Sequence, residues 1–343
     1  MKKKYICFVA GRSGGHIVPA LTLAQDLKHE NPENNIIFFS TKSGVDKSLL
    51  QNHQTLTRWI PLNLANFPRK KLYRYPQFLW HLTLTFFKSL FYLIRYRPEK
   101  LIAMGGYISI PVCLAAWILQ IPQELFELNV IPGKATTFLK PFVPQIAICF
   151  KQAKKYLPTA KCYNAPYPVR FPSQTLKIPR KEALAAMTFL TARSTIMILG
   201  GSQGSAFLNN IIKKWIELNP AYHSKIQIIH QTGLLHDKYD LEDFYTKYKI
   251  PAFVFDYFDE LENCYRAANL IICRSGAGTL FEVKFFNKPC ITIPLHAKTT
   301  GHQYHNAQAM KELSPLFTVM QQHEIEKSAS LLDKSIRNCL QKR

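Results

Sequence analysis

The ten residues from Thr195 to Gly204, Thr-Ile-Met-Ile-Leu-Gly-Gly-Ser-Gln-Gly, decide the fold. The run 195–199 predicts a strand buried on both faces, because such strands carry continuous rather than alternating apolar residues. The glycines after it predict a tight turn that leads into a helix. A strand, a glycine turn and a helix in this order form the repeating unit of a doubly wound parallel sheet.

Similar apolar runs recur along the chain and are separated by helical stretches. The strand candidates are residues 5–10, 36–40, 101–104, 124–129 and 146–150 in the first half, and residues 195–199, 226–230, 253–255, 270–273 and 290–294 in the second. The two series predict an α/β protein with two doubly wound, Rossmann-like domains. The length of 343 residues suits two domains of ordinary size.

Three prolines mark the expected domain boundary: Pro166, Pro168 and Pro172. Proline fixes φ and disfavours helix, so this segment predicts a stiff, extended connector. The expected domains are residues 1–164 and residues 165–343.

The composition limits the classes of partner. The chain carries 44 Lys and Arg against 22 Asp and Glu, a formal net charge of +22. Such a field attracts nucleic acid, an anionic membrane surface or a phosphorylated substrate. No nucleic-acid-binding sequence pattern is evident, so a nucleic acid is not expected.

The eight cysteines form no CxxC pair and fit no zinc spacing, which favours reduced thiols without a metal. The short apolar run after the N-terminal lysines predicts no secretion signal.

Glycine turns follow three of the strand candidates, at Gly11–His16, Gly105–Tyr107 and Gly200–Gly204. A glycine turn before a helix N-terminus can bind an anion, because free N–H groups and a partial positive charge meet there. One such turn alone is as readily a tight turn that needs positive φ. Three turns at the ligand-binding edge of parallel sheets favour a phosphate-bearing ligand. The first turn is not GxGxxG, and Asp46 sits in a loop-like context, which argues against a dinucleotide oxidoreductase.

Two further motifs in the second half carry groups suited to a nucleotide sugar. Glu282 follows Arg274 and a glycine-rich turn, and its carboxylate could bind ribose hydroxyls or serve as a helix-capping charge. Both interpretations stay open at this point. Gln303 and Asn306 are three residues apart and share a helix face, where amide groups suit sugar hydroxyls.

In their order and spacing, these motifs resemble those of the peptidoglycan GlcNAc transferases, the MurG family. The resemblance covers nearly the whole chain, as far as about Asn306. It implies a GT-B fold, in which two Rossmann-like domains face a cleft, with the last helix packing back on the first domain. It implies inverting transfer of GlcNAc from UDP-GlcNAc to the 4-hydroxyl of undecaprenyl-diphosphate-linked MurNAc-pentapeptide. The enzyme would be peripheral at the cytoplasmic face of the cell membrane, where other cell-wall enzymes are possible partners.

The resemblance also implies roles for individual residues. His16 matches the proposed general base, and Gly14, Gly15, Tyr107 and Asn129 match the acceptor side. The positions implied for UDP-GlcNAc are Ser13, Gly14, Gly15, His16, Asn129, Arg170, Ser202, Gln203, Phe258, Glu282, Gln303 and Asn306. The sequence has no Asp-x-Asp motif, so no divalent ion is expected to be obligatory, and a stimulatory effect of one stays open.

Several positions depart from the family pattern. Arg12 and Ala103 stand where the family has glycine, Phe126 where it has histidine, and Tyr167 where it has asparagine. The donor half therefore matches better than the acceptor half. Two alternatives stay open: a GT-B enzyme for another lipid acceptor such as diacylglycerol, and a weakly active relative that binds a nucleotide sugar.

The segment 67–100 is basic and aromatic, which is typical of a surface that docks on an anionic membrane. The residues expected to contact the membrane are Arg69, Lys70, Lys71, Phe78 and Trp80. The apolar stretch 77–94 is interrupted by His81 and Lys88 and is marginal in length for a bilayer span. Leu82, Phe86 and Leu93 are expected to pack in the domain core instead.

Overall fold

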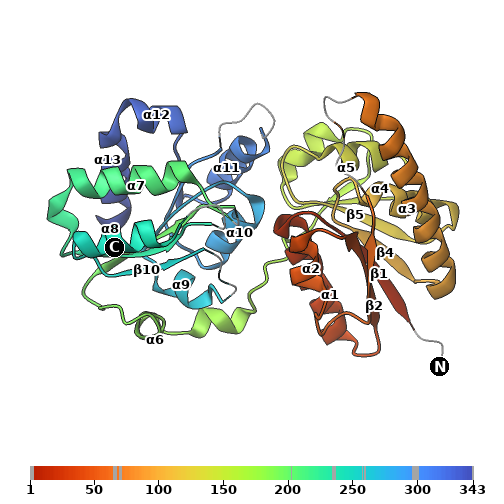
Figure 1. The fold of residues 1–343 in the computed structure, drawn as a ribbon, viewed down its shortest axis with the longest axis horizontal. Coiled ribbons are helices and arrows are strands. Elements are labelled where there is room, and N and C mark those ends of the chain that lie inside the picture. Colours follow the sequence, from red (N-terminus) through yellow and green to blue (C-terminus); the bar gives the residue numbers. More distant parts are fainter. Residues whose placement is uncertain are drawn as a thin grey trace. The chain divides into compact units, whose positions relative to one another are not determined.

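The structure is a computed structural model that describes residues 4–64, 68, 72–201, 203–233, 237–256, 258, 260–295 and 301–341. The chain forms two compact units, Met1–Arg170 and Phe171–Arg343 (Figure 1). The expected boundary lay between residues 164 and 165. The units divide a few residues later, after Arg170, and residues 162–164 form an edge strand of the first sheet.

A seven-stranded sheet in the order β3-β2-β1-β4-β5-β6-β7 forms the centre of the first unit. Its strands are β1 Tyr5–Val9, β2 Asn35–Thr41, β3 Arg58–Leu62, β4 Lys100–Ala103, β5 Gln123–Glu127, β6 Ile146–Ile148 and β7 Cys162–Asn164. Each pairs in parallel with its neighbours. The strand order reverses between β1 and β4, and ligands bind at such a switch point in open α/β sheets.

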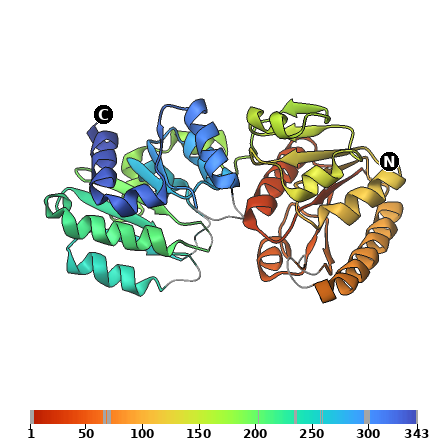
Figure 2. The ribbon, with the colours of Figure 1, turned by 90° about the horizontal axis from the view of Figure 1, so that it is seen from above.

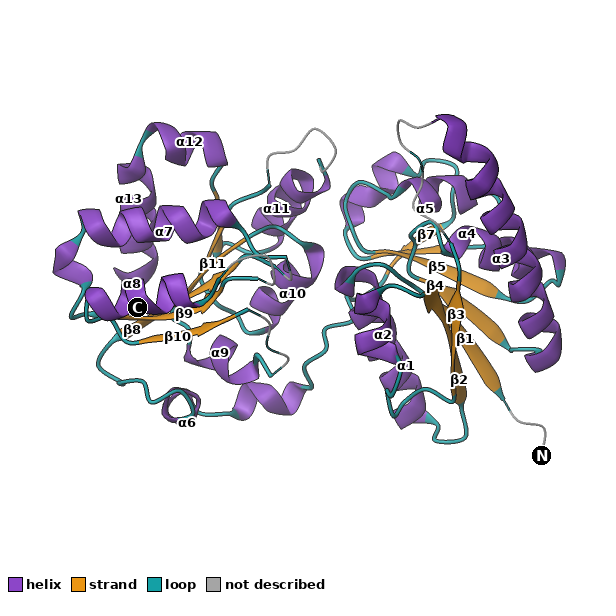
Figure 3. Ribbon diagram, in the orientation of Figure 1, coloured by secondary structure: helices purple, strands orange, loops and turns teal. Residues whose placement is uncertain are grey.

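Helices cover both faces of this first sheet (Figure 3). They are α1 Gly14–Glu30, α2 Gly44–Leu50, α3 Tyr75–Tyr96, α4 Ser109–Ile118 and α5 Lys134–Leu139, with short 3₁₀ turns η1 Leu72–Arg74 and η2 Lys151–Tyr156. The glycine turn leads directly into α1 at Gly14 with Ser13 as N-cap, so Pro19 lies inside the helix.

The second unit is built around a six-stranded sheet in the order β10-β9-β8-β11-β12-β13. Its strands are β8 Ser194–Leu199, β9 Ile226–Gln231, β10 Ala252–Phe255, β11 Leu270–Cys273, β12 Cys290–Thr292 and β13 Phe317–Val319. All pairings are parallel, and the order reverses between β8 and β11. The structure thus confirms the predicted fold class of two doubly wound parallel sheets.

The helices of the second unit lie on both faces of its sheet (Figure 2). They are α6 Arg180–Ala185, α7 Ala206–Leu218, α8 Tyr239–Lys247, α9 Glu262–Ala267, α10 Ala277–Phe285, α11 His302–Leu313, α12 Gln322–Lys327 and α13 Ala329–Gln341, with 3₁₀ turns η3 Ser173–Lys177 and η4 Pro220–Tyr222. The last helix, α13, was expected to pack back on the first domain. It packs in the core of its own unit, because Leu332 and Ile336 are buried against the apolar residues of that core.

Candidate active site

The first glycine turn is held by a buried carboxylate. The Arg12 N–H donates to Asp46 Oδ1 (2.9 Å), and the Thr41 N–H and hydroxyl both donate to Asp46 Oδ2 (2.8 Å each). A Cβ added to Gly11 would lie only 3.0 Å from Asp46 Oδ2, so the backbone of the turn approaches the carboxylate closely. Asp46 is therefore not a loop residue, as its sequence context indicated, but part of α2, where it fixes the turn after β1.

Arg12 occupies a backbone conformation that favours glycine, with φ of 69°. Its guanidinium donates to the Leu64 carbonyl, while Nε has no hydrogen-bond partner among the described residues. Burial lowers the pKa of Arg12, because the charged group loses water. The contacts of Arg12 therefore hold its backbone in a left-handed conformation that is strained for any residue other than glycine.

Replacing Arg12 with glycine is expected to raise the melting temperature. The change removes about 1–2 kcal/mol of left-handed backbone strain and leaves the N–H that donates to Asp46. Arg12→Ala, which keeps the strain but removes the guanidinium, is the matched control, and scanning calorimetry measures both variants. A melting temperature below that of the wild type for Arg12→Gly would show that the guanidinium contacts outweigh the strain.

His16 lies in the first turn of α1, with its Nδ1 3.1 Å from Ser13 Oγ. Its ring is half-buried, and the loss of water lowers its pKa below the usual value. The imidazole is therefore neutral near pH 7, which is the form that accepts a proton.

The second glycine turn lies beside the His16 ring. Gly105 and Gly106 have φ of 75° and 77°, and a Cβ on Gly106 would lie 4.0 Å from His16 Nδ1. The structure thus brings together two of the motifs that the sequence singled out. Tyr107 follows this turn and is half-buried against the core of the first unit.

Glu127 was not predicted as a site residue, yet it organises the loop that carries Asn129. It is the last residue of β5 and is 4% exposed. Its Oε1 accepts from the Asn129 N–H (3.0 Å) and side-chain amide (3.4 Å). Its Oε2 accepts from the Gly133 N–H (3.0 Å) and the Thr136 hydroxyl (2.7 Å). Desolvation raises the pKa of Glu127, and these hydrogen bonds oppose that rise. In the sequence, the feature that could have indicated this role is an acidic residue at the end of a strand that is otherwise buried.

In the second unit, the Gly200–Gly204 turn packs backbone against backbone. Gly201 and Gly204 have φ of 83° and 76°. A Cβ on Gly204 would lie 1.9 Å from the Thr232 carbonyl oxygen, and one on Gly200 would lie 2.7 Å from the Ser205 nitrogen. Ser205 is the N-cap of α7, so the turn delivers the chain to a helix N-terminus. Gln203 is exposed, and Ser202 lies outside the described residues.

Arg274, which the sequence placed in a motif without a role, joins several loops at this sheet edge. Its guanidinium donates to Ser205 Oγ (3.0 Å), the Ile293 carbonyl (3.1 Å) and Gln322 Oε1 (3.4 Å). Burial lowers the pKa of Arg274 to about 10, so the group stays cationic at neutral pH. It therefore adds a fixed positive charge next to the α7 N-cap.

The remaining donor-side residues take distinct positions. Glu282 lies beyond the first turn of α10, which excludes the capping interpretation, and its Oε2 accepts from the Tyr265 hydroxyl (2.7 Å). Gln303 Oε1 accepts from the Leu295 N–H (2.9 Å). Asn306 is 1% exposed, whereas Gln303 is half-buried. The ring centroid of Phe258 lies 5.6 Å from those of two β10 phenylalanines, edge-on to Phe253 and tilted to Phe255. Arg170 is half-buried at the end of the first unit.

The predicted membrane residues divide between core and surface. Phe78 was expected on the membrane, and this was wrong: it is 7% exposed and packs in the core of the first unit. Trp80 is 64% exposed. Leu82 and Phe86 pack against the core, and Leu93 is buried, as predicted. Arg69, Lys70 and Lys71 lie outside the described residues. No helix in the described ranges is both long and apolar enough to cross a bilayer.

Two doubly wound parallel sheets, each with glycine turns at the carboxyl ends of its strands, give the chain the architecture of the GT-B class. The chain belongs to glycosyltransferase family 28, whose N-terminal domain matches residues 6–148 and whose C-terminal domain matches residues 195–343.

Similar proteins carry one name in common. An enzyme of Halothermothrix orenii is 31% identical over 322 residues, which span 90% of this chain and 83% of that protein. One of Protochlamydia amoebophila is 32% identical over 311 residues, which span 90% and 80%. Both are named UDP-N-acetylglucosamine–N-acetylmuramyl-(pentapeptide) pyrophosphoryl-undecaprenol N-acetylglucosamine transferase.

Solved structures share the fold. The crystal structure of Acinetobacter baumannii MurG has a TM-score of 0.72 at 21% identity and covers 98% of this chain and 91% of its own. A UDP-GlcNAc 2-epimerase from Methanocaldococcus jannaschii has a TM-score of 0.65 at 15% identity, with 99% and 93% covered. The epimerase shows that this fold also supports a second type of reaction on UDP-GlcNAc.

Proposed function

We propose that this protein transfers GlcNAc from UDP-GlcNAc to the 4-hydroxyl of undecaprenyl-diphosphate-linked MurNAc-pentapeptide. The observation that carries the proposal is the neutral His16 beside two glycine turns at the switch point of the first sheet. The relatives that match most of the chain are named for this reaction.

His16 acts as the general base. Its Nδ1 contacts Ser13 Oγ, so Nε2 is the nitrogen that takes the proton from the acceptor hydroxyl. As the oxygen loses its proton, it attacks the anomeric carbon and forms the new C–O bond. The bond from that carbon to the UDP phosphate breaks, and the bonding electrons leave with UDP. A single displacement inverts the anomeric configuration.

The second unit holds the donor. The charge that develops on UDP is stabilised by the glycine turn that contains Ser202 and Gln203 and by the start of α7, because helix N–H groups bind anions. Glu282 binds the ribose, and its orientation is fixed by Tyr265. Gln303 binds GlcNAc, and the backbone near Phe258 meets the uracil. Asn306, which is 1% exposed, does not reach the sugar directly. No metal ion is required in this scheme, so transfer activity is expected to persist in EDTA.

The first unit holds the acceptor. Gly14 and Gly15 present N–H groups to the lipid diphosphate at the start of α1. Asn129 binds the acceptor sugar. Glu127 positions it through two hydrogen bonds to Asn129 itself and two that tie the loop to Gly133 and to Thr136 of α5.

An exposed face of α3 docks on an anionic membrane. The α3 stripe consists of Trp80, Leu84, Phe87, Phe91 and Ile94, which are 64%, 48%, 60%, 61% and 50% exposed. Their spacing of three and four places them on one side of the helix. An apolar stripe of this length on an exposed surface marks an interaction site, and basic residues close by in the sequence, Arg74 and Arg95, favour anionic lipid.

Replacing Trp80 and Phe87 together with serine is expected to weaken vesicle binding at least about tenfold, because each side chain contributes roughly 1.5–3 kcal/mol when buried in lipid. Sedimentation with phosphatidylglycerol vesicles measures the change. The control is Leu218→Ser with Tyr239→Ser, which removes similarly exposed apolar groups from the second unit. Equal binding by wild type and the α3 variant would remove α3 from the membrane contact.

The acceptor itself is tested by competition. We expect radiolabelled GlcNAc to appear on a short-chain analogue of the diphosphate-linked MurNAc-pentapeptide and not on diacylglycerol. Labelling of diacylglycerol alone would assign the protein to the other lipid acceptor. Binding of UDP-GlcNAc with no labelling of either lipid would favour the weakly active relative.

A further inference from the structure

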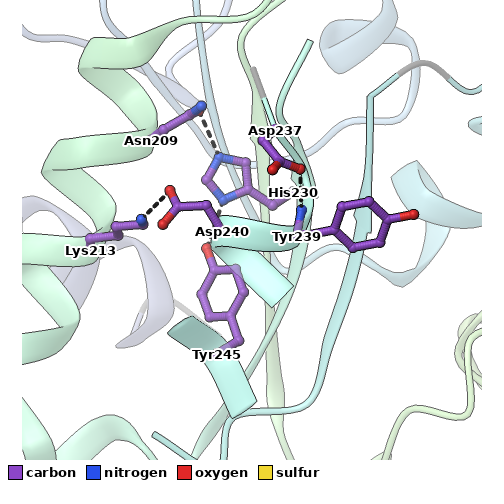
Figure 4. A network of polar contacts seen from close by, with 7 residues as sticks. All are labelled: Asn209, Lys213, His230, Asp237, Tyr239, Asp240 and Tyr245. Carbon is purple, nitrogen blue, oxygen red and sulfur yellow. Dashed lines mark hydrogen bonds and ion pairs between the residues drawn. The ribbon is translucent and has the colours of Figure 1, made fainter. Parts of the chain in front are cut away.

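A fully buried histidine links three elements behind the donor turn. His230 lies near the carboxyl end of β9 and is 0% exposed. Its Nδ1 is 2.6 Å from the Tyr245 hydroxyl of α8, and its Nε2 is 3.1 Å from Asn209 Oδ1 of α7. Figure 4 shows His230 between these two side chains. We call these three residues the His230 network.

The hydrogen bonds of the network fix the state of the imidazole. Burial raises the pKa of Tyr245, so its hydroxyl keeps its proton and donates to Nδ1. The proton of the ring then sits on Nε2 and donates to Asn209 Oδ1. Burial, reinforced by the charge of Lys213, lowers the pKa of His230 to about 3. The neutral ring therefore satisfies both partners, and no polar atom of the ring lacks one.

The network connects directly to the donor turn. Asn209 is the fourth residue of α7, one turn after the N-cap Ser205. On the other side, the chain leaves β9 after Gln231 and reaches Gly233, where an added Cβ would lie 2.0 Å from the Gly204 nitrogen. His230 thus sits between the helix that begins after the turn and the backbone on which the turn rests.

A second contact also joins α7 to α8. Lys213, one turn after Asn209 on α7, already pairs with Asp240 of α8 at the surface (Figure 4). What His230 adds is a fixed separation between the start of α7 and the end of β9. A buried polar group that is fully paired specifies one arrangement more strictly than apolar packing does.

We propose that His230 is a positioning residue for the donor diphosphate, acting through Asn209 on the first turns of α7. The inference rests on the proposed function, in which this turn binds the UDP diphosphate. His230→Phe would keep the ring packing but leave Asn209 and Tyr245 without their hydrogen bonds to the imidazole. The first turns of α7 could then shift, so that their N–H groups no longer point at the diphosphate.

The test compares His230→Phe, His230→Gln and Tyr245→Phe by calorimetric titration with UDP and by steady-state kinetics. We expect His230→Phe to raise the Kd for UDP and the KM for UDP-GlcNAc about tenfold or more, since two hydrogen bonds are lost. The KM for the lipid acceptor stays unchanged. His230→Gln restores part of the affinity because glutamine keeps a donor and an acceptor, and Tyr245→Phe gives a smaller loss.

Two variants separate positioning from stability. Asp240→Asn breaks only the surface pair and is expected to bind UDP like the wild type. Leu332→Ala, in the same core on α13, lowers the melting temperature without touching the network. If Leu332→Ala weakens UDP binding as much as His230→Phe, or if His230→Phe binds UDP normally, the inference is overturned. Because UDP binding is measured without acceptor, absence of GlcNAc transfer by the wild type contradicts the proposed function and not this inference.

Discussion

Replacing His16 with alanine is expected to lower kcat for GlcNAc transfer by roughly 100- to 10,000-fold, the usual contribution of a general base. The ring is the group beside both glycine turns of the first unit that can take a proton at neutral pH. Alanine fits in the same helical turn, so α1 persists. Binding of UDP to the second unit is retained, which calorimetric titration verifies.

The pH dependence adds a second readout. Burial lowers the pKa of His16 below its usual value near 6.5, so the neutral base persists as pH falls to that range. In the wild type, kcat/KM is therefore level above about pH 6.5 and falls only as pH drops through the lowered pKa. This acid limb is absent from the residual activity of His16→Ala.

His29→Ala is the matched control, because His29 is an exposed histidine at the other end of α1. We expect its kcat to equal that of the wild type. A His16→Ala variant that turns over at the normal rate would exclude this residue as the base.

Replacing Gly204 with alanine is expected to raise the KM for UDP-GlcNAc on the order of 100-fold, because the turn cannot keep its place. The added Cβ would lie 1.9 Å from the Thr232 carbonyl oxygen and 2.9 Å from Gly233 Cα. Both contacts are to backbone, which has no side-chain torsion to relieve the overlap. The α7 N-terminus then moves away from the diphosphate.

Gly201 provides the control for backbone strain alone. Its φ of 83° matches that of Gly204, but an added Cβ meets nothing within 4 Å. Gly201→Ala therefore carries only about 1–2 kcal/mol of left-handed strain and a correspondingly smaller change in KM. Steady-state kinetics and calorimetric UDP titration compare the two variants. Equal effects at both glycines would show that the Gly204–Thr232 approach does not position the turn.

All ten predicted strands appear in the structure. They could be predicted because the sequence of a buried parallel strand is a continuous apolar run. The three that were missed lie at sheet edges: β3, β7 and β13. β3 contains Pro61 among mixed residues, and β7 is largely exposed. Edge strands are half-solvated and short, so their sequences do not differ clearly from loops.

The site residues that could be predicted are those that lie in short, contiguous sequence motifs. The glycine turns and His16 stand out in the sequence because they are contiguous motifs. The roles of Asp46 and Arg274 were not visible, because they depend on contacts between distant segments, such as that of Asp46 with Arg12, 34 residues away.

Phe78 illustrates a different kind of error. Two residues along a helix are separated by about 200°, so Phe78 and Trp80 cannot both face the membrane. The helical period alone would have assigned one of them to the core.

The most direct test of the account is to incubate the wild-type protein with UDP-GlcNAc and the diphosphate-linked MurNAc-pentapeptide analogue, and to identify every sugar product by NMR. We predict UDP and a single β-linked disaccharide lipid in equal amounts, with no product when the acceptor is left out. Conversion of UDP-GlcNAc to its C2 epimer without acceptor, the reaction for which structural relatives of this fold are named, would contradict the account.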